Sequence, residues 1–267
     1  MSNSTDDTLR RRDDLTKQDP ATLYVQSYLL IRTIVGLIGI LLPIVFIIGE
    51  RYFVGGGVHV RGSLSAYYHT SMRDIFVAGL CVIGFLLATY MSGKIKSWDF
   101  WLSLVAGVAV LGVVFFPTWR PGLLSGAPRC GTTPTPEGCS PIQQQLGEAP
   151  VAGIHFVCAA VFILSLAWIS FLFARREERY GKNAGMARFQ RICGWAIVGA
   201  VVGVVAGELL RIDIWELTPL YIEEVMSVWA FGASWLSKGK DLRAMLSPGS
   251  GGDVAQTKHQ ATMELMT

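Results

Sequence analysis

A short polar segment next to an apolar run holds several side chains that could do chemistry. Residues 63–74 read Ser-Leu-Ser-Ala-Tyr-Tyr-His-Thr-Ser-Met-Arg-Asp, so a histidine, an arginine and an aspartate lie beside a stretch long enough to enter a bilayer. Farther along the chain, His155 and Glu223 each interrupt an apolar run. Titratable groups inside membrane segments are costly to bury, and they mostly face a bundle interior or a water-filled cavity.

The topology described below puts these groups at one depth in the membrane. The second and fourth apolar runs begin on the outer side, the fifth ends there, and the sixth begins there. We therefore predict one outward-facing polar pocket built from several helices. Its predicted members are Ser65, Tyr68, His69, Arg73, Asp74, His155 and Glu223. The same outer half also holds Glu208, Arg211, Glu216 and Glu224.

Two imidazoles and two carboxylates in this pocket form a possible zinc site. The metal ligands would be His69, Asp74, His155 and Glu223, with a water molecule completing the shell. Zinc would acidify that water for attack on an ester or an amide. A second interpretation is a transporter cavity in which Glu223 and the histidines titrate. A third is a structural or lipid-binding subunit in which the polar cluster fixes the register of the helices.

Several of these residues also have a structural interpretation without chemistry. Ser71 and Asp74 match the S-x-x-D/E capping box of a helix start. His155 lies near a helix start and could hydrogen-bond a neighbouring backbone group. Arg32, in the inner part of the first run, could extend its guanidinium group to the inner interface.

Six apolar runs must position these residues. Of 267 residues, 51% are hydrophobic and 16% are charged, whereas about a quarter are charged in soluble domains. The runs cover 28–48, 75–91, 101–117, 151–173, 192–210 and 216–237. Backbone amides in hydrocarbon must be satisfied within the segment, so the runs are predicted to be helices. The expected fold is an all-α, polytopic six-transmembrane-helix bundle over residues 23–240, between disordered cytoplasmic tails at 1–22 and 241–267.

The basic residues set the expected orientation, because Lys and Arg mark the cytoplasmic side. With both termini inside, most basic residues fall in the cytoplasmic segments, in the ranges 10–17, 94–96, 175–191 and 238–258. A bacterial inner membrane is the expected location. The net charge of +3 is therefore a sign of topology, and no nucleic-acid surface is predicted. The chain also has no G-x-x-x-x-G-K-[ST] phosphate loop and no C-x-x-C-H haem motif.

Two further features concern packing. Cys130 and Cys139 lie in the longest connection, 118–150, which is predicted to be outside and could be closed by a disulfide or carry two free thiols. In the fifth run, Gly199, Gly203 and Gly207 share one helix face. That face would pack against another helix of the same chain or against a helix of a partner.

The segment from Leu64 to Val77 resembles a family of uncharacterised bacterial six-span integral membrane proteins. Shared features are S-x-Y-Y-x-T-x-x-R-D-x-F-V, a proline closing the third span at Pro117, a histidine opening the fourth at His155, and the segment Trp229 to Gly239 in the last span. The resemblance implies the same six-span architecture.

Ser65 and His69 have the S-x-x-x-H spacing of the membrane hydrolase superfamily that includes alkaline ceramidases and adiponectin-receptor-like proteins. This similarity implies a zinc-dependent hydrolase of lipid amides or esters. The chain departs from that pattern in having six spans instead of seven, Asp74 on the same helix as His69, and Glu223 where the superfamily has histidines.

Taken together, the sequence predicts an integral membrane protein whose polar pocket binds a small molecule or lipid head group. The alternatives are a metal-dependent membrane hydrolase and a structural subunit of a membrane complex.

Overall fold

The computed structural model describes residues 20–55, 60–90, 96–122, 126–180, 184–210 and 218–246, and these residues are all-α. The elements are α2 (Pro20–Val54), the 3-10 helix η1 (Ser65–His69), α3 (Arg73–Thr89), α4 (Trp98–Phe115), α5 (Pro141–Leu146), α6 (Glu148–Tyr180), α7 (Ala184–Leu210) and α8 (Pro219–Leu246). The predicted tails fall largely outside the described residues. Helix α8 nevertheless continues to Leu246, beyond the predicted boundary at residue 240.

Four of these helices are long and apolar enough to cross a membrane. The segments are Gln26–Val54, Trp98–Phe115, Glu148–Arg179 and Ala184–Gly207. Many of their large apolar side chains point outward, for example Leu41, Val108, Val157, Leu164 and Val202. Such continuous apolar exposure indicates a lipid environment. Helix α3, with 17 residues, and the more polar α8 are not among the four.

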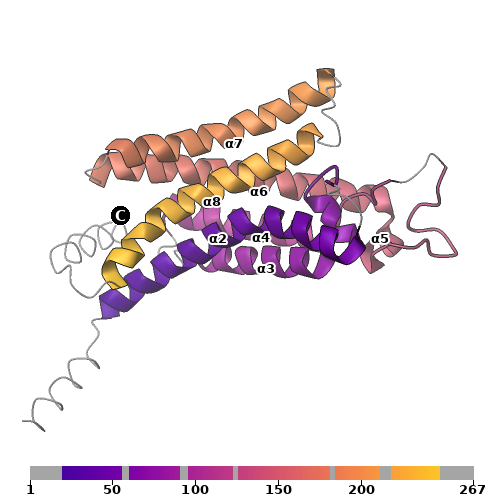
Figure 1. Ribbon diagram of the computed structural model, residues 1–267, viewed down its shortest axis with the longest axis horizontal. Coiled ribbons are helices and arrows are strands. Elements are labelled where there is room, and N and C mark those ends of the chain that lie inside the picture. Colours follow the sequence, from indigo (N-terminus) through magenta and orange to yellow (C-terminus); the bar gives the residue numbers. More distant parts are fainter. Residues whose placement is uncertain are drawn as a thin grey trace, which may run out of the picture.

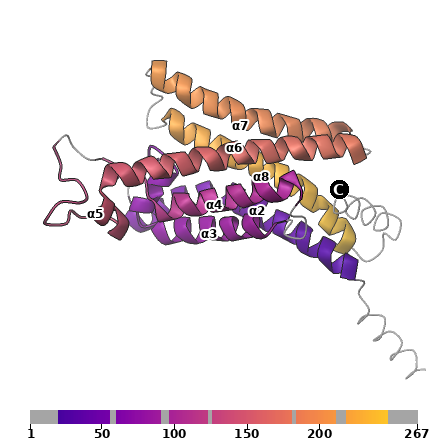
Figure 2. The same ribbon diagram turned by 180° about the vertical axis from the view of Figure 1, so that it is seen from behind.

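The six long helices form a closed ring. Following contacts from helix to helix, α2 packs against α8, α8 against α7, α7 against α6, α6 against α4, α4 against α3, and α3 against α2. Figures 1 and 2 show them running roughly side by side. The beginning of α2 and the end of α8 lie at one end of the bundle's long axis, and α5 lies at the other end (Figure 1). This arrangement brings α6, α7 and α8 together around His155, Glu223 and Glu224.

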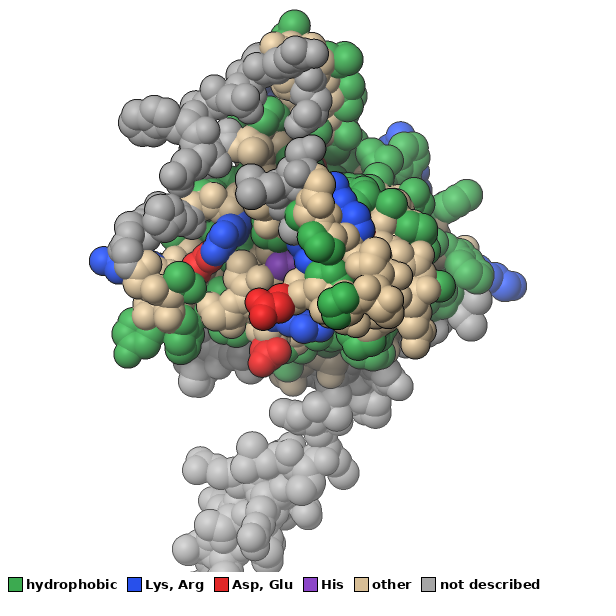
Figure 3. Space-filling view, turned by 90° about the vertical axis from the view of Figure 1, so that its right-hand side faces the viewer, with side chains coloured by type: hydrophobic (Ala, Val, Ile, Leu, Met, Phe, Trp, Pro, Cys, Tyr) green, Lys and Arg blue, Asp and Glu red, His purple; other side chains and the backbone are tan. Residues whose placement is uncertain are grey.

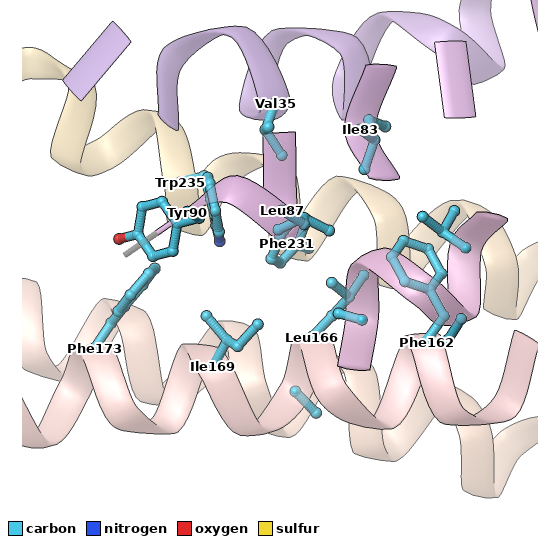
Figure 4. Packing of buried hydrophobic residues seen from close by; sticks show 14 of the residues in the cluster. Val35, Ile83, Leu87, Tyr90, Phe162, Leu166, Ile169, Phe173, Phe231 and Trp235 are labelled. Atoms are coloured by element: carbon cyan, nitrogen blue, oxygen red, sulfur yellow. The ribbon is translucent and has the colours of Figure 1, made fainter. Parts of the chain in front are cut away.

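Aromatic side chains fill the half of the bundle near the beginning of α2 and the end of α8. Trp235 is fully buried and packs in tilted ring contacts against Tyr90, Phe173 and Phe231, with ring centroids 5.0, 5.9 and 5.0 Å away (Figure 4). Arg32 is 1% exposed, and its guanidinium carbon lies 3.9 Å from the centre of the Phe173 ring. Aromatic faces therefore hold this cation inside the bundle, where the sequence had left open an extension to the inner interface.

Glycines bring backbones together at two helix crossings, but not at the predicted stripe. A Cβ atom built on Gly36 would lie 2.9 Å from the carbonyl oxygen of Gly232, and one on Gly107 would lie 2.6 Å from that of Gly84. Nothing lies within 4 Å of a Cβ on Gly199 or Gly203. At the stripe only Gly207 is in close contact, with Pro219 of α8. Packing within the molecule therefore accounts for Gly207 and leaves the other two glycines of the stripe facing open space.

In the connection between α4 and α6, the described residues 116–122 and 126–147 form a cap on the bundle. Cys130 and Cys139 lie at disulfide-bonding distance, as predicted. Arg120 is held by the carboxylate of Glu148, with its Nη2 and Nε atoms 3.1 and 3.3 Å from the carboxylate oxygens. Glu148 also accepts hydrogen bonds from the backbone amides of Arg120, at 3.0 Å, and Cys130, at 3.4 Å. One buried carboxylate thus joins the loop to the first turn of α6.

Candidate functional site

The segment around η1 is fastened to α8 by one carboxylate. Glu224 accepts hydrogen bonds from the backbone amide of Leu64 at 2.5 Å and from the hydroxyl of Ser65 at 3.0 Å. Helical starts leave backbone amides without partners in their own helix, so an acceptor from another element stabilises this turn. The hydroxyl of Ser63 accepts a hydrogen bond from the backbone amide of Ala66 at 3.0 Å, which completes the turn.

His155 is positioned by the end of α4. Its Nδ1 lies 2.7 Å from the carbonyl oxygen of Phe116 and 3.2 Å from that of Val113. Carbonyl oxygens only accept hydrogen bonds, so Nδ1 carries a proton, and in the neutral imidazole Nε2 keeps a lone pair. The side chain is 1% exposed, and Nε2 has no hydrogen-bond partner among the described residues. The backbone contact considered for this histidine is present, and it leaves the second ring nitrogen available.

Glu223, the neighbouring carboxylate of α8, is buried. It is 5% exposed, and its Oε1 accepts a hydrogen bond from Ser227, one turn later, at 2.9 Å. Because consecutive helical residues point about 100° apart, Glu223 and Glu224 leave the helix in different directions. Glu224 turns toward η1, whereas Glu223 borders both the bundle interior and the groove between α7 and α8.

These groups share a cavity of about 180 Å³ between α6, α7, α8 and η1. Its polar lining is Ser63, Ser65, His155, Glu223 and Glu224, and its walls are apolar side chains of α6, α7 and α8. Two neighbouring spaces share lining residues with this cavity. An apolar cavity in the bundle core, about 70 Å³, shares Ser65, Ala159 and Glu224 with it. A groove of about 410 Å³ between α7 and α8 shares Glu223 and has Gly199 and Gly203 in its wall.

The structure divides the predicted pocket. Ser65, His155 and Glu223 meet in the cavity, whereas Tyr68, His69, Arg73 and Asp74 are not among its lining residues. This cavity therefore brings together three of the seven residues predicted to form one pocket. Ser63 and Glu224 belong to the site and were not predicted to line it. Their signal in the sequence was the acid next to Glu223 and a second serine two positions before Ser65.

Three of the four excluded residues make other contacts, and the fourth, Asp74, is exposed. Arg73 donates to the hydroxyl of Tyr68 at 2.8 Å, and its guanidinium carbon lies 4.5 Å from the Tyr68 ring centre. His69 donates from Nε2 to the carbonyl oxygen of Thr118 at 2.9 Å. Burial lowers the pKa of His69, and this hydrogen bond opposes that change. Asp74 is exposed in the first turn of α3. The end of the molecule that carries α5 mixes histidine, charged and apolar side chains (Figure 3).

The capping box predicted at the start of α3 does not form. The N-cap residue is Met72, which makes no side-chain cap, and the amide of Met72 donates to the hydroxyl of Thr70 at 3.1 Å. Thr70 therefore makes a different local hydrogen bond, with the amide of Met72, in the turn that precedes α3.

The predicted zinc ligands do not converge. In the part of the chain that the structure describes, no three His, Cys, Asp or Glu side chains are close enough to share a metal ion. Local geometry explains the failure of the S-x-x-x-H pattern. In an α-helix, Ser65 and His69 would lie on nearly one face. They lie instead in a 3-10 helix, whose roughly three residues per turn put the two side chains about 120° apart.

Comparison of the chain with protein-family models, with curated proteins and with solved structures found no match. The function must therefore be argued from the cavity.

Proposed function

We propose that this chain is a six-span membrane protein that binds an amphiphilic molecule, a lipid or a small molecule, whose polar group contacts Ser65, His155, Glu223 and Glu224. The observation that carries the proposal is a buried polar cluster that lies where apolar spaces meet. Ligand sites combine apolar walls with a few polar groups that fix orientation. Here the polar group of a ligand would contact the cluster, and its apolar part would enter the core cavity or the groove.

The proposed topology has both termini in the cytoplasm of a bacterial cell and the cap of the α4–α6 connection outside the inner membrane. Three observations support it. The beginning of α2 and the end of α8 are at the same end of the bundle, as an even number of membrane crossings requires (Figure 1). The cysteine pair is at the opposite end, where an oxidising compartment would favour it. The basic segments also favour the cytoplasm for the end with the termini. Helices α3 and α8 would be the two additional crossings.

Filling the cavity tests the binding proposal. Ala159 lines both the polar cavity and the core cavity, so Ala159→Phe should exclude the ligand. Extraction and mass spectrometry of protein purified in a mild detergent should find one enriched amphiphile, near one per chain, in the wild type and at least tenfold less in Ala159→Phe.

The matched control is Val157→Phe, because Val157 is on the same helix, is exposed and lines none of these spaces. It should retain the wild-type amount of the amphiphile. If neither the wild type nor this control carries an enriched amphiphile, the binding proposal is wrong. Thermal melting of all three proteins shows whether a loss of ligand reflects a loss of fold.

A metal-dependent hydrolase is the second candidate, and one observation favours it. A histidine that donates from Nδ1 to a backbone carbonyl and presents Nε2 has the arrangement typical of metal-ligating histidines. Glu223 and Glu224 line the same cavity, and their side chains would have to move toward His155 to complete a metal site. Near-equimolar zinc in purified protein that is absent from His155→Ala would favour this candidate over simple binding.

A further inference from the structure

We infer that the polar group of the ligand is a hydrogen-bond-donating cation, an ammonium group carried on an apolar chain. This inference rests on the proposed binding function and specifies which chemistry the cavity selects. It follows from two properties of the lining residues, which are their remaining hydrogen-bonding capacity and their charge.

The first property is that the lining side chains, apart from the hydroxyl of Ser63, have already used their donors and have acceptors to spare. The hydroxyl of Ser65 donates to Glu224, and Nδ1 of His155 donates to carbonyl oxygens of α4. What remains is the lone pair on Nε2 of His155 and the free lone pairs of the Glu223 and Glu224 carboxylates. Nε2 is the decisive atom, because it is buried and has no partner in the part of the chain that the structure describes. A ligand that supplies donors would satisfy it.

The second property is that, within the described residues, no lysine or arginine lines the cavity, the core cavity or the groove. Nearby arginines have other partners, since Arg61 pairs with Glu50 and Arg73 contacts Tyr68. A carboxylate in apolar surroundings is stable as an anion only with a compensating cation or strong hydrogen bonds, and otherwise it takes up a proton. A cationic ligand group would supply that compensation, whereas a phosphate or carboxylate head would not, and an ionised glutamate would repel it.

An organic ammonium group fits better than a metal ion. A metal needs several ligands at short distance from one point, and the described residues do not provide three. An ammonium group instead can donate hydrogen bonds to acceptors that lie apart from one another, because its N–H groups point in different directions. Its charge is also attracted to each carboxylate. The adjoining apolar spaces would receive an alkyl chain, which a bare ion does not have.

Three probes of equal chain length test the charge preference directly. The full chain, in nanodiscs of neutral phosphatidylcholine, is titrated calorimetrically with dodecylamine, dodecanol and dodecanoate, and partition into empty nanodiscs is subtracted. We expect dodecylamine to bind saturably at one site and at least tenfold more tightly than dodecanol, with no saturable binding of dodecanoate. This comparison uses the wild type alone, so it does not depend on the folding of any variant.

Variants then locate the effect. Glu223→Gln combined with Glu224→Gln should reduce dodecylamine affinity to that of dodecanol. Glu178→Gln, at an exposed glutamate outside the three spaces, should leave both affinities unchanged. Equal affinities for the amine and the alcohol in the wild type, or tighter binding of dodecanoate, would overturn the inference. Such a result would leave the proposed function intact if Ala159→Phe weakens that binding, whereas the absence of saturable binding for all three probes would count against both.

Discussion

Replacing Glu148 with alanine should lower the free energy of unfolding by about 3–5 kcal/mol, the cost of removing one partner of a buried ion pair. The Arg120 and Glu148 side chains are 8% and 1% exposed. Without the carboxylate, Arg120 would be a buried cation without its counter-charge, and the backbone amides of Arg120 and Cys130 would lose their acceptor. The expected loss is therefore larger than that of a surface pair, because several buried donors depend on one side chain.

A matched control is available in the same protein. Glu178 pairs with Arg191, and these side chains are 46% and 50% exposed. Glu178→Ala should change stability by about 0–1 kcal/mol, because solvent screens exposed pairs. Denaturation in a detergent titration measures both variants, and protease cleavage within the α4–α6 connection reports local opening. If the two substitutions had equal effects, the cap would not depend on its buried carboxylate. Lysine at position 120 with Glu148 retained should give an intermediate loss, since it keeps the charge but not the hydrogen bonds of the guanidinium group.

The second large effect is expected from the smallest possible substitution in a helix. Gly107→Ala should destabilise the protein by about 1–3 kcal/mol, the usual cost of overpacking. A Cβ atom there would lie 2.6 Å from the carbonyl oxygen of Gly84 and 2.8 Å from the backbone nitrogen of Ala88. Both are backbone atoms, so α3 and α4 would have to move apart along their crossing. Loosened packing should also lower the melting temperature in detergent.

Gly203→Ala is the matched substitution, because Gly203 is also inside a helix but has open space where a Cβ would be. Alanine favours a helix over glycine by about 0.5–1 kcal/mol, so this variant should be as stable as the wild type or slightly more stable. Opposite signs for the two substitutions are the expected result. A loss of stability at position 203 similar to that at 107 would indicate that a further helix covers the groove between α7 and α8, as the pattern Gly199, Gly203 and Gly207 suggests.

Much of the architecture could be predicted from composition along the chain. Apolar runs must become helices in lipid, since only internal hydrogen bonds satisfy their backbones there. Four of the six predicted runs correspond to helices with the required length and hydropathy. The cysteine pair could also be predicted, because its nine-residue separation lies within one connection and needs no knowledge of how the helices pack.

The identity of the residues that meet in the cavity could not be predicted in the same way. Whether a residue lines the cavity depends on the rotation of its helix and on the local backbone conformation, and small changes in either redirect a side chain. The 3-10 geometry of η1 separates His69 from Ser65, although their spacing would place them together in an α-helix. Depth in the membrane was therefore a poor guide to contact between side chains.

The contrast between glycines has the same physical origin. The four-residue spacing at Gly199, Gly203 and Gly207 is visible in the chain, whereas the close crossing of Gly84 and Gly107 joins two helices without any repeated pattern. Hydropathy is a property of each segment, and it specified the helices because the bilayer acts on each one separately. Contacts between helices depend on how all six rotate and cross, which is why the arrangement of His155, Glu223 and Glu224 became visible only once the ring was assembled.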